Sequence, residues 1–214
     1  MQDIKLESIK DKNFDSIALI QAVKMDVIQF PAEILKKKSI DVDGVSEDIV
    51  KLIYNMAKTM YESNGCGIAA IQVGMPLKIF IVDTSKESNS PMIFINPKIT
   101  WKADFLEPKP EGCLSVVLDK ETEDRLGISA TIDIDGNQKK QKLCVPRYSD
   151  IIIEYFDMAM DKKIIHAGGF LGHVIQHETD HTNGIIYLDL LPYHIKKIIE
   201  KTTSKFNPSY KIDK

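Results

Sequence analysis

Long apolar runs, cysteine and net charge are all scarce in this chain of 214 residues. No stretch approaches the roughly 20 consecutive apolar residues that cross a bilayer, so we expect no transmembrane helix and no membrane partner. The three cysteines, Cys66, Cys113 and Cys144, are too few and odd in number for a disulfide scaffold. A thiol here is therefore better interpreted as a ligand or nucleophile. The formal net charge of −3 gives no support for a nucleic-acid-binding surface, and we expect no specific DNA binding.

A targeting signal is also missing from the first residues. Residues 1–15 contain no apolar core and carry four acidic side chains, which argues against a secretory signal and against an acid-poor transit peptide. We expect a cytoplasmic protein in which residues 1–26 form a polar extension. The rest is ordinary for one globular domain, with 43% hydrophobic and 28% charged residues.

Hydrophobic periodicity predicts three helices. The first spans Ser46–Tyr61, where Ser46 can cap the helix, the next residues are acidic, and an apolar stripe recurs at helical spacing. A second helix is expected over Phe170–Thr182, ended by Asn183-Gly184, and a third over Pro192–Ser204. A short helical turn is expected after Pro31.

Strand-like segments lie between these helices. They are Lys78–Asp83, Met92–Asn96, Ser129–Asp135 and Ile151–Phe156. The turn signal Asp135-Gly136 favours a hairpin that continues into Lys139–Cys144. Helices together with hairpin-type strands predict an α+β fold, with mostly antiparallel strands packed around a central helix and a helix at the C-terminus.

The sharpest chemical signal is the segment His177-Glu178-Thr179-Asp180-His181. Residues i and i+4 share one helix face, so His177 and His181 can bind one metal ion while Glu178 reaches a water on that ion. A surface helix with two histidines by chance is the alternative. The motif lies on an amphipathic helix, and the chain has only five histidines, so we interpret it as a metal site.

A catalytic metal usually needs a third protein ligand. A metzincin would place a histidine where this chain has Tyr187, which excludes that class. Two candidates stay open. Glu200 would complete a thermolysin-like endopeptidase site, and Cys113 would supply a thiolate, which suits iron, zinc and nickel.

Three segments in order resemble the signature motifs of peptide deformylase. They are Gly65-Cys66-Gly67-Ile68-Ala69-Ala70-Ile71-Gln72, Glu111-Gly112-Cys113-Leu114-Ser115, and Gln176 through His181 with Gly184 following. The resemblance covers roughly Val27–Leu191. It implies a hydrolase that removes the formyl group from N-formylmethionyl peptides of newly made proteins. It also implies one divalent metal held by Cys113, His177 and His181, with Fe2+ in vivo and Zn2+ or Ni2+ as substitutes on isolation.

The resemblance further assigns roles around the metal. Glu178 is expected to be the general base, and Gln72 and the Leu114 backbone N–H to stabilise the oxyanion. The expected substrate-binding backbone is Gly65, Gly67 and Gly112. A buried ion pair between Asp180 and Arg147 is expected to steady the metal-binding helix.

Some features depart from the family. Cys66 stands where an aliphatic residue is usual and Ile71 where proline is common. Val116–Cys144 is longer than expected, so we treat it as an insertion within a catalytic domain of residues 27–192 and expect it to influence substrate selectivity. Residues 193–214 form a lysine-rich C-terminal helix and tail, which is either a solvated face or a ribosome contact.

A non-catalytic binding module with this fold is the remaining alternative. Loss of Glu178 or Gln72 would have favoured that alternative, and both are present.

Overall fold

A five-stranded antiparallel sheet forms the centre of the fold. The computed structural model describes residues 14–87, 90–126, 130–132, 138–140 and 143–203. The strands are β1 (Gly67–Ala69), β2 (Ile79–Val82), β3 (Met92–Lys102), β4 (Leu106–Glu111), β5 (Ala130–Ile132), β6 (Gln138–Lys140), β7 (Leu143–Tyr148), β8 (Asp150–Phe156) and β9 (Lys162–Gly168). The large sheet has the order β1-β2-β3-β8-β9, while β4 pairs with β7 and β5 with β6, all antiparallel.

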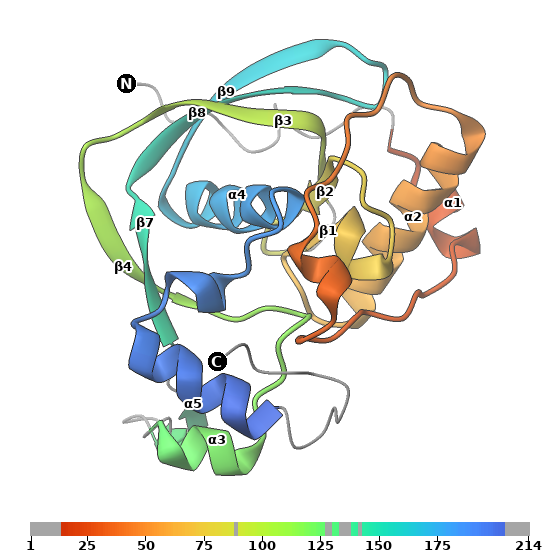
Figure 1. Ribbon diagram of the computed structural model, residues 1–214. Coiled ribbons are helices and arrows are strands. Elements are labelled where there is room, and N and C mark those ends of the chain that lie inside the picture. Colours follow the sequence, from red (N-terminus) through yellow and green to blue (C-terminus); the bar gives the residue numbers. More distant parts are fainter. Residues whose placement is uncertain (1–13, 88–89, 127–129, 133–137, 141–142, 204–214) are drawn as a thin grey trace.

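Five α-helices and three 3₁₀ turns accompany the described strands. They are α1 (Ser16–Gln21), η2 (Glu33–Lys36), α2 (Glu47–Glu62), η3 (Ala70–Val73), α3 (Lys120–Arg125), α4 (Gly169–Thr182), η4 (Tyr187–Leu190) and α5 (Tyr193–Thr203). Figure 1 shows α4 in the middle of the fold, enclosed by the sheet and by the β4–β7 ribbon. The predicted α+β architecture around a central helix is confirmed. Within the described segments, no helix combines the length and apolarity that crossing a bilayer requires.

Two apolar cores hold the central sheet. Helix α2 begins where the sequence predicts, because the Ser46 hydroxyl accepts a hydrogen bond from the Ile49 amide at 3.4 Å. Its buried face, including Ile53 and Met56, packs against the β1–β3 side of the sheet. On the other face, Ile175 of α4 packs among fully buried aromatic and aliphatic side chains of β2, β3 and β8. Each fully buried side chain of this size contributes about 1.5–3 kcal/mol, so α4 is fixed by packing on most of its circumference.

Several elements were not predicted. Strand β4 has the sequence Leu-Glu-Pro-Lys-Pro-Glu, and proline normally argues against a strand. Proline is tolerated in β4 because, among the described residues, this strand belongs to a two-stranded ribbon in which one edge of each strand has no strand partner. Pro108 lies opposite Pro146 of β7. Strand β9, which contains two lysines and a glycine, is stabilised by seven paired positions with β8.

Strand β3 runs six residues beyond the predicted end at Asn96. Asn96 has φ +51°, and the register with β8 shifts just after Ile95, so the alternation of side chains is interrupted there. The Asn96 amide forms two 2.8 Å hydrogen bonds with the Val42 backbone, which stabilises this irregular backbone.

The start of the described chain is not a separate arm. Helix α1 and the residues around it lie along α2, where Asp15 N donates to the Tyr54 hydroxyl at 2.8 Å and Met25 N to Thr59 Oγ1 at 2.9 Å. The described part of the expected 1–26 extension is therefore attached to the domain.

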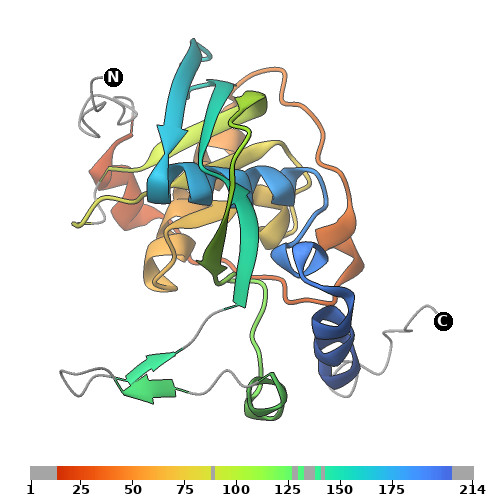
Figure 2. The same cartoon turned by 90° about the vertical axis from the view of Figure 1, so that its left-hand side faces the viewer.

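The expected insertion contains a helix, α3, that the sequence did not predict. Asp119 caps α3 by accepting from the Thr122 amide at 2.7 Å, and Thr122 Oγ1 lies 2.6 Å from Thr202 Oγ1 of α5. The predicted hairpin is present as β5–β6, although its turn at Asp135-Gly136 lies outside the described residues. Cys144 belongs to β7 rather than to the hairpin. Figure 2 shows α3 and the hairpin at the edge of the fold, apart from α4.

The C-terminal helix is part of the core. Ile199 of α5 is fully buried in a cluster with residues that include Leu35 and Val145. Two of its lysines are ion-paired, Lys196 with Asp189 at 2.7 Å and Lys197 with Glu200 at 3.0 Å. Removal of α5 would therefore expose an apolar core, whereas the sequence left residues 193–214 as either a solvated face or a ribosome contact.

Candidate active site

The three sequence motifs meet around one cavity of about 270 Å³. The described residues that line it come from the segment before β1 and its first residue, from η3, from the end of β4 and the segment after it, and from α4. They are Asn64, Gly65, Cys66, Gly67, Gln72, Pro110, Glu111, Gly112, Cys113, Leu114, Phe170, His173, Val174, His177 and Glu178. No described residue of Val116–Cys144 lines it, so the structure gives no support for the expected influence of that insertion on selectivity.

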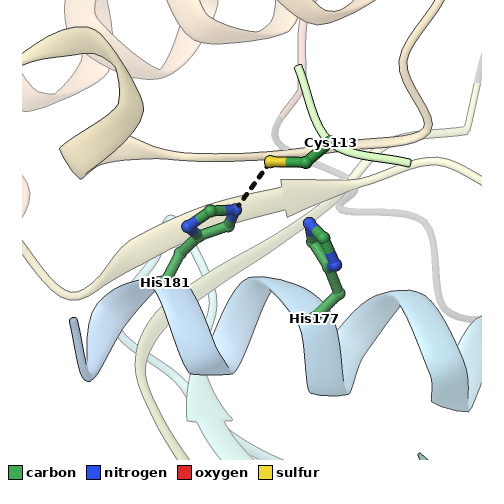
Figure 3. A group of neighbouring side chains, drawn as sticks. All are labelled: Cys113, His177 and His181. Carbon is green, nitrogen blue, oxygen red and sulfur yellow. Dashed lines mark hydrogen bonds between the residues drawn. The ribbon is translucent and has the colours of Figure 1, made fainter. Parts of the chain in front are cut away.

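Cys113, His177 and His181 form the metal-ligand cluster. Their nearest ligand atoms all lie within 4.8 Å of one another, and no other group of three such residues is found in the described chain. Cys113 Sγ lies 3.2 Å from His181 Nε2, and both rings project from α4 towards the thiol (Figure 3). One thiolate and two imidazoles suit iron, zinc and nickel, so the residues present fit a divalent metal.

The two histidines have opposite proton affinities. Burial, and secondly the charge of His177, lower the pKa of His181 well below its usual value, so this ring is neutral and offers a lone pair. Burial also disfavours a charged His177, but hydrogen bonds with Cys113 and Glu111 outweigh it and raise the pKa of His177 well above its usual value. A metal bound here must displace a proton from the cluster.

Glu178 is buried beside the cluster with one oxygen unsatisfied. Its side chain is 3% exposed, and Oε2 has no hydrogen-bond partner among the described residues. Burial is the main reason that the pKa of Glu178 rises to about 7. A carboxyl group with that pKa can both accept and return a proton near neutral pH.

Two glycines make room for this arrangement. A methyl group on Gly67 would lie 2.4 Å from Glu178 Oε1, and one on Gly65 would lie 2.9 Å from Leu114 Cδ1. The sequence suggested that these glycines let the backbone approach a small formyl group. The structure adds a second reason, because Gly67 gives Glu178 its space.

Gln72 is held in one orientation at the edge of the cavity. Its Oε1 accepts from the Ala69 amide at 2.8 Å, while Nε2 donates to Ser115 Oγ at 3.1 Å and approaches Cys113 Sγ at 3.6 Å. The Gln72 NH₂ group therefore points at the metal-ligand cluster. The hydrogen bond from the Ala69 amide to Oε1 fixes the orientation of the side-chain amide.

Glu111 is the central residue of a network that sequence analysis missed. Oε1 accepts from Arg147 Nε at 2.5 Å and from His173 Nε2 at 2.8 Å, and Oε2 is bonded to Arg147 Nη2 at 3.1 Å and to His177 Nδ1 at 2.7 Å. Burial would raise the pKa of Glu111, but hydrogen bonds from His173, His177 and Arg147 lower it, so the group is ionised. Two features of the sequence could have predicted this network: Glu111 lies two residues before Cys113, and His173 lies one helical turn before His177.

The expected partner of Asp180 is present. Arg147 Nη1 lies 2.5 Å from Asp180 Oδ2, with the Arg147 side chain 5% and the Asp180 side chain 23% exposed. Arg147 also binds Glu111, so one guanidinium joins Asp180 of α4 to the carboxylate that contacts His177.

Comparisons with known proteins agree with this site. The sequence model of the family Polypeptide deformylase matches residues 24–126 and 134–196. The chain belongs to the polypeptide deformylase family. A peptide deformylase of Maricaulis maris is 35% identical over 171 residues, covering 78% of this chain and 84% of that protein. One of Chromohalobacter salexigens is 30% identical over 179 residues, covering 83% and 92%.

A solved structure agrees with the fold of this deformylase. The peptide deformylase of Ehrlichia chaffeensis in complex with actinonin has a TM-score of 0.69 and 26% identity, covering 87% of this chain and 99% of that one. The family consists of metal-dependent hydrolases, as the sequence resemblance implied. The unmatched residues 127–133 fall inside the stretch interpreted as an insertion.

Glu200 does not belong to the metal site of this deformylase. It lies on α5, where its carboxylate is paired with Lys197 at 3.0 Å and Lys196 at 3.9 Å. The described metal-ligand cluster contains Cys113 in its place. This removes the support for an endopeptidase with Glu200 as third ligand.

Proposed function

We propose that this deformylase hydrolyses the formamide of N-formylmethionyl nascent peptides at the cavity above α4, with one divalent metal held by Cys113, His177 and His181. The observation that carries the proposal is the position of Glu178, with a pKa of about 7, beside a cluster of one thiol and two imidazoles within 4.8 Å. Family resemblance favours Fe2+ as the metal in vivo, and Zn2+ or Ni2+ fits the same ligands.

The proton transfers are assigned to Glu178. A bound divalent ion supplies Lewis acidity, which lowers the pKa of a water towards neutrality. Glu178 accepts one proton from that water during attack on the formyl carbon. It returns the proton to the amine nitrogen as the carbon–nitrogen bond breaks, which yields formate and the free methionyl amine.

The negative charge that develops on the formyl oxygen needs donors. Gln72 and Leu114 line the cavity, and we assign the Gln72 Nε2 group and the Leu114 backbone N–H as these donors, each worth about 3 kcal/mol in the transition state. Because Ala69 and Ser115 fix the Gln72 amide, this donor is oriented before the substrate arrives. Gly65, Gly67 and Gly112 provide backbone close to the formylmethionyl residue.

The chemistry implies a cellular setting. Formylated chains emerge from ribosomes, so we place this deformylase in the cytoplasm and include a ribosome contact through the lysines of α5 and the following tail. The test is co-sedimentation with ribosomes over a salt series, comparing the full chain with a variant that lacks residues 204–214. We expect weaker and less salt-sensitive binding for the shorter chain, with unchanged hydrolysis of free peptides.

The proposed reaction is tested with anaerobically purified protein whose metal content has been measured. We expect formate release from formyl-Met-Ala-Ser and no cleavage of unformylated Met-Ala-Ser. Glu178→Gln is the matched control, because an amide cannot accept the proton of water. This variant should bind metal and lose activity by several orders of magnitude. Near-normal turnover by Glu178→Gln would remove Glu178 as the base.

A further inference from the structure

His173 belongs to the Glu111 network, and the proposed reaction gives it no role. It lies on α4 one turn before His177, is 6% exposed, and lines the cavity beside Phe170, whose ring stands edge-on to it at 6.2 Å between centroids. Its Nε2 lies 2.8 Å from Glu111 Oε1. A buried histidine that binds the carboxylate behind a metal ligand is placed to influence that ligand.

The direction of the hydrogen bonds follows from the chemistry of Glu111. An ionised carboxylate only accepts, so His173 donates from Nε2–H and His177 donates from Nδ1–H. The Nδ1–H tautomer of His177 leaves the lone pair on Nε2, which is the atom available to the metal. Glu111 therefore selects the tautomer and the ring orientation of His177.

Glu111 is held from two sides. Arg147 binds both of its oxygens from β7, while the two histidines bind one oxygen each from successive turns of α4. Arg147 is also bonded to Asp180, so the guanidinium group of Arg147 has little freedom to change its orientation. Without His173, α4 would contact the carboxylate only through the His177 bond itself, and Oε1 would lose its hydrogen bond from this helix.

We propose that His173 is a positioning residue for the metal centre, which it orients through Glu111 and His177. This inference rests on the proposed metal site at Cys113, His177 and His181. The loss of such an outer hydrogen bond typically lowers metal affinity about 10- to 100-fold. We therefore expect faster metal release when the donor at position 173 is removed.

The experiment measures release of Co2+ to excess chelator from the loaded protein. Two variants remove the donor, His173→Leu, which fills the space, and His173→Asn, whose amide is too short to reach Glu111. His173→Gln retains an N–H group at the distance of the imidazole Nε2. Phe170→Leu is the control for the cavity wall, since it changes the neighbouring ring and leaves the Glu111 network intact.

We expect release from the Leu and Asn variants to be about tenfold faster or more, with release from His173→Gln within about threefold of the wild type. The absorption bands of bound Co2+ should shift in the same two variants, and Phe170→Leu should release at the wild-type rate. Equal release from all four variants would overturn the role of His173 and leave the proposed function standing. A wild-type protein that binds no Co2+ through Cys113 would overturn the proposed function and this inference together.

Discussion

The buried carboxyl group of Glu178 should destabilise the metal-free protein in a pH-dependent way. Its Oε2 is buried and unsatisfied, and its pKa rises from 4.5 to about 7, chiefly because burial disfavours the charged form. A shift of this size corresponds to about 3 kcal/mol of free energy between the protonated and ionised forms. Glutamine has nearly the same shape and is uncharged at every pH, so Glu178→Gln isolates this cost.

The sign follows from the two pKa values. Below the unfolded value of 4.5, Glu178 is protonated in both states and the cost is absent. Between 4.5 and about 7, the unfolded state has lost this proton while the folded state still holds it, so the stability falls as the pH rises, and the loss is complete once the folded state has ionised as well. Relative to wild type, metal-free Glu178→Gln should therefore gain stability as the pH rises. About 2 kcal/mol of this change falls between about pH 5.5 and about pH 8.5.

The assay is urea unfolding of both proteins across this pH range, with chelator and reductant present. The free energy of unfolding is taken from midpoints at an unchanged denaturant slope. Because all other groups titrate in both proteins, they cancel in the difference between the two curves. A difference that is constant with pH would refute the reasoning, since Glu178 would then not carry a raised pKa in the folded state.

Three further predictions concern metal and catalysis. Cys113→Ala should abolish stoichiometric metal binding while Glu200→Ala retains it, as measured by metal analysis after gel filtration; the opposite result would restore Glu200 as the third ligand. Gln72→Leu should lower kcat by about 100-fold with little change in KM, because its amide acts where negative charge develops; an effect confined to KM would limit Gln72 to substrate positioning. Gly67→Ala should keep its metal but lose about 100-fold in kcat, because the new methyl group would lie 2.4 Å from Glu178 Oε1 and displace that carboxylate. A wild-type kcat for this variant would show that Glu178 can move without affecting catalysis.

The local elements of the site could be predicted because short-range rules fix them. His177 and His181 are four residues apart on a helix, and that spacing alone brings both rings to one face. The capped start of α2 and the end of α4 at Asn183 follow equally from nearby residues. Cys113 was one of two open candidates until the order of three motifs pointed to it.

The missed elements are those whose stability comes from distant partners. Helix α3 is six residues long and consists entirely of polar residues, so its sequence favours a solvated loop. Its contacts with α5, including the Thr122–Thr202 hydrogen bond, hold it in the fold. Strand β4 contains two prolines and is held by its pairing with β7, a partner more than 30 residues away in the sequence and the one strand that pairs with it among the described residues.

The sequence by itself determined which residues can bind a metal and accept a proton, because these properties belong to side chains and to helical spacing. Tertiary structure alone decided that Glu111 of β4 and Arg147 of β7, together with His173 of α4, meet behind His177. Residues up to 66 positions apart form these hydrogen bonds, and no local pattern encodes which of them will be neighbours. The raised pKa of Glu178 has the same origin, because burial is its main cause and exists only after the chain has folded.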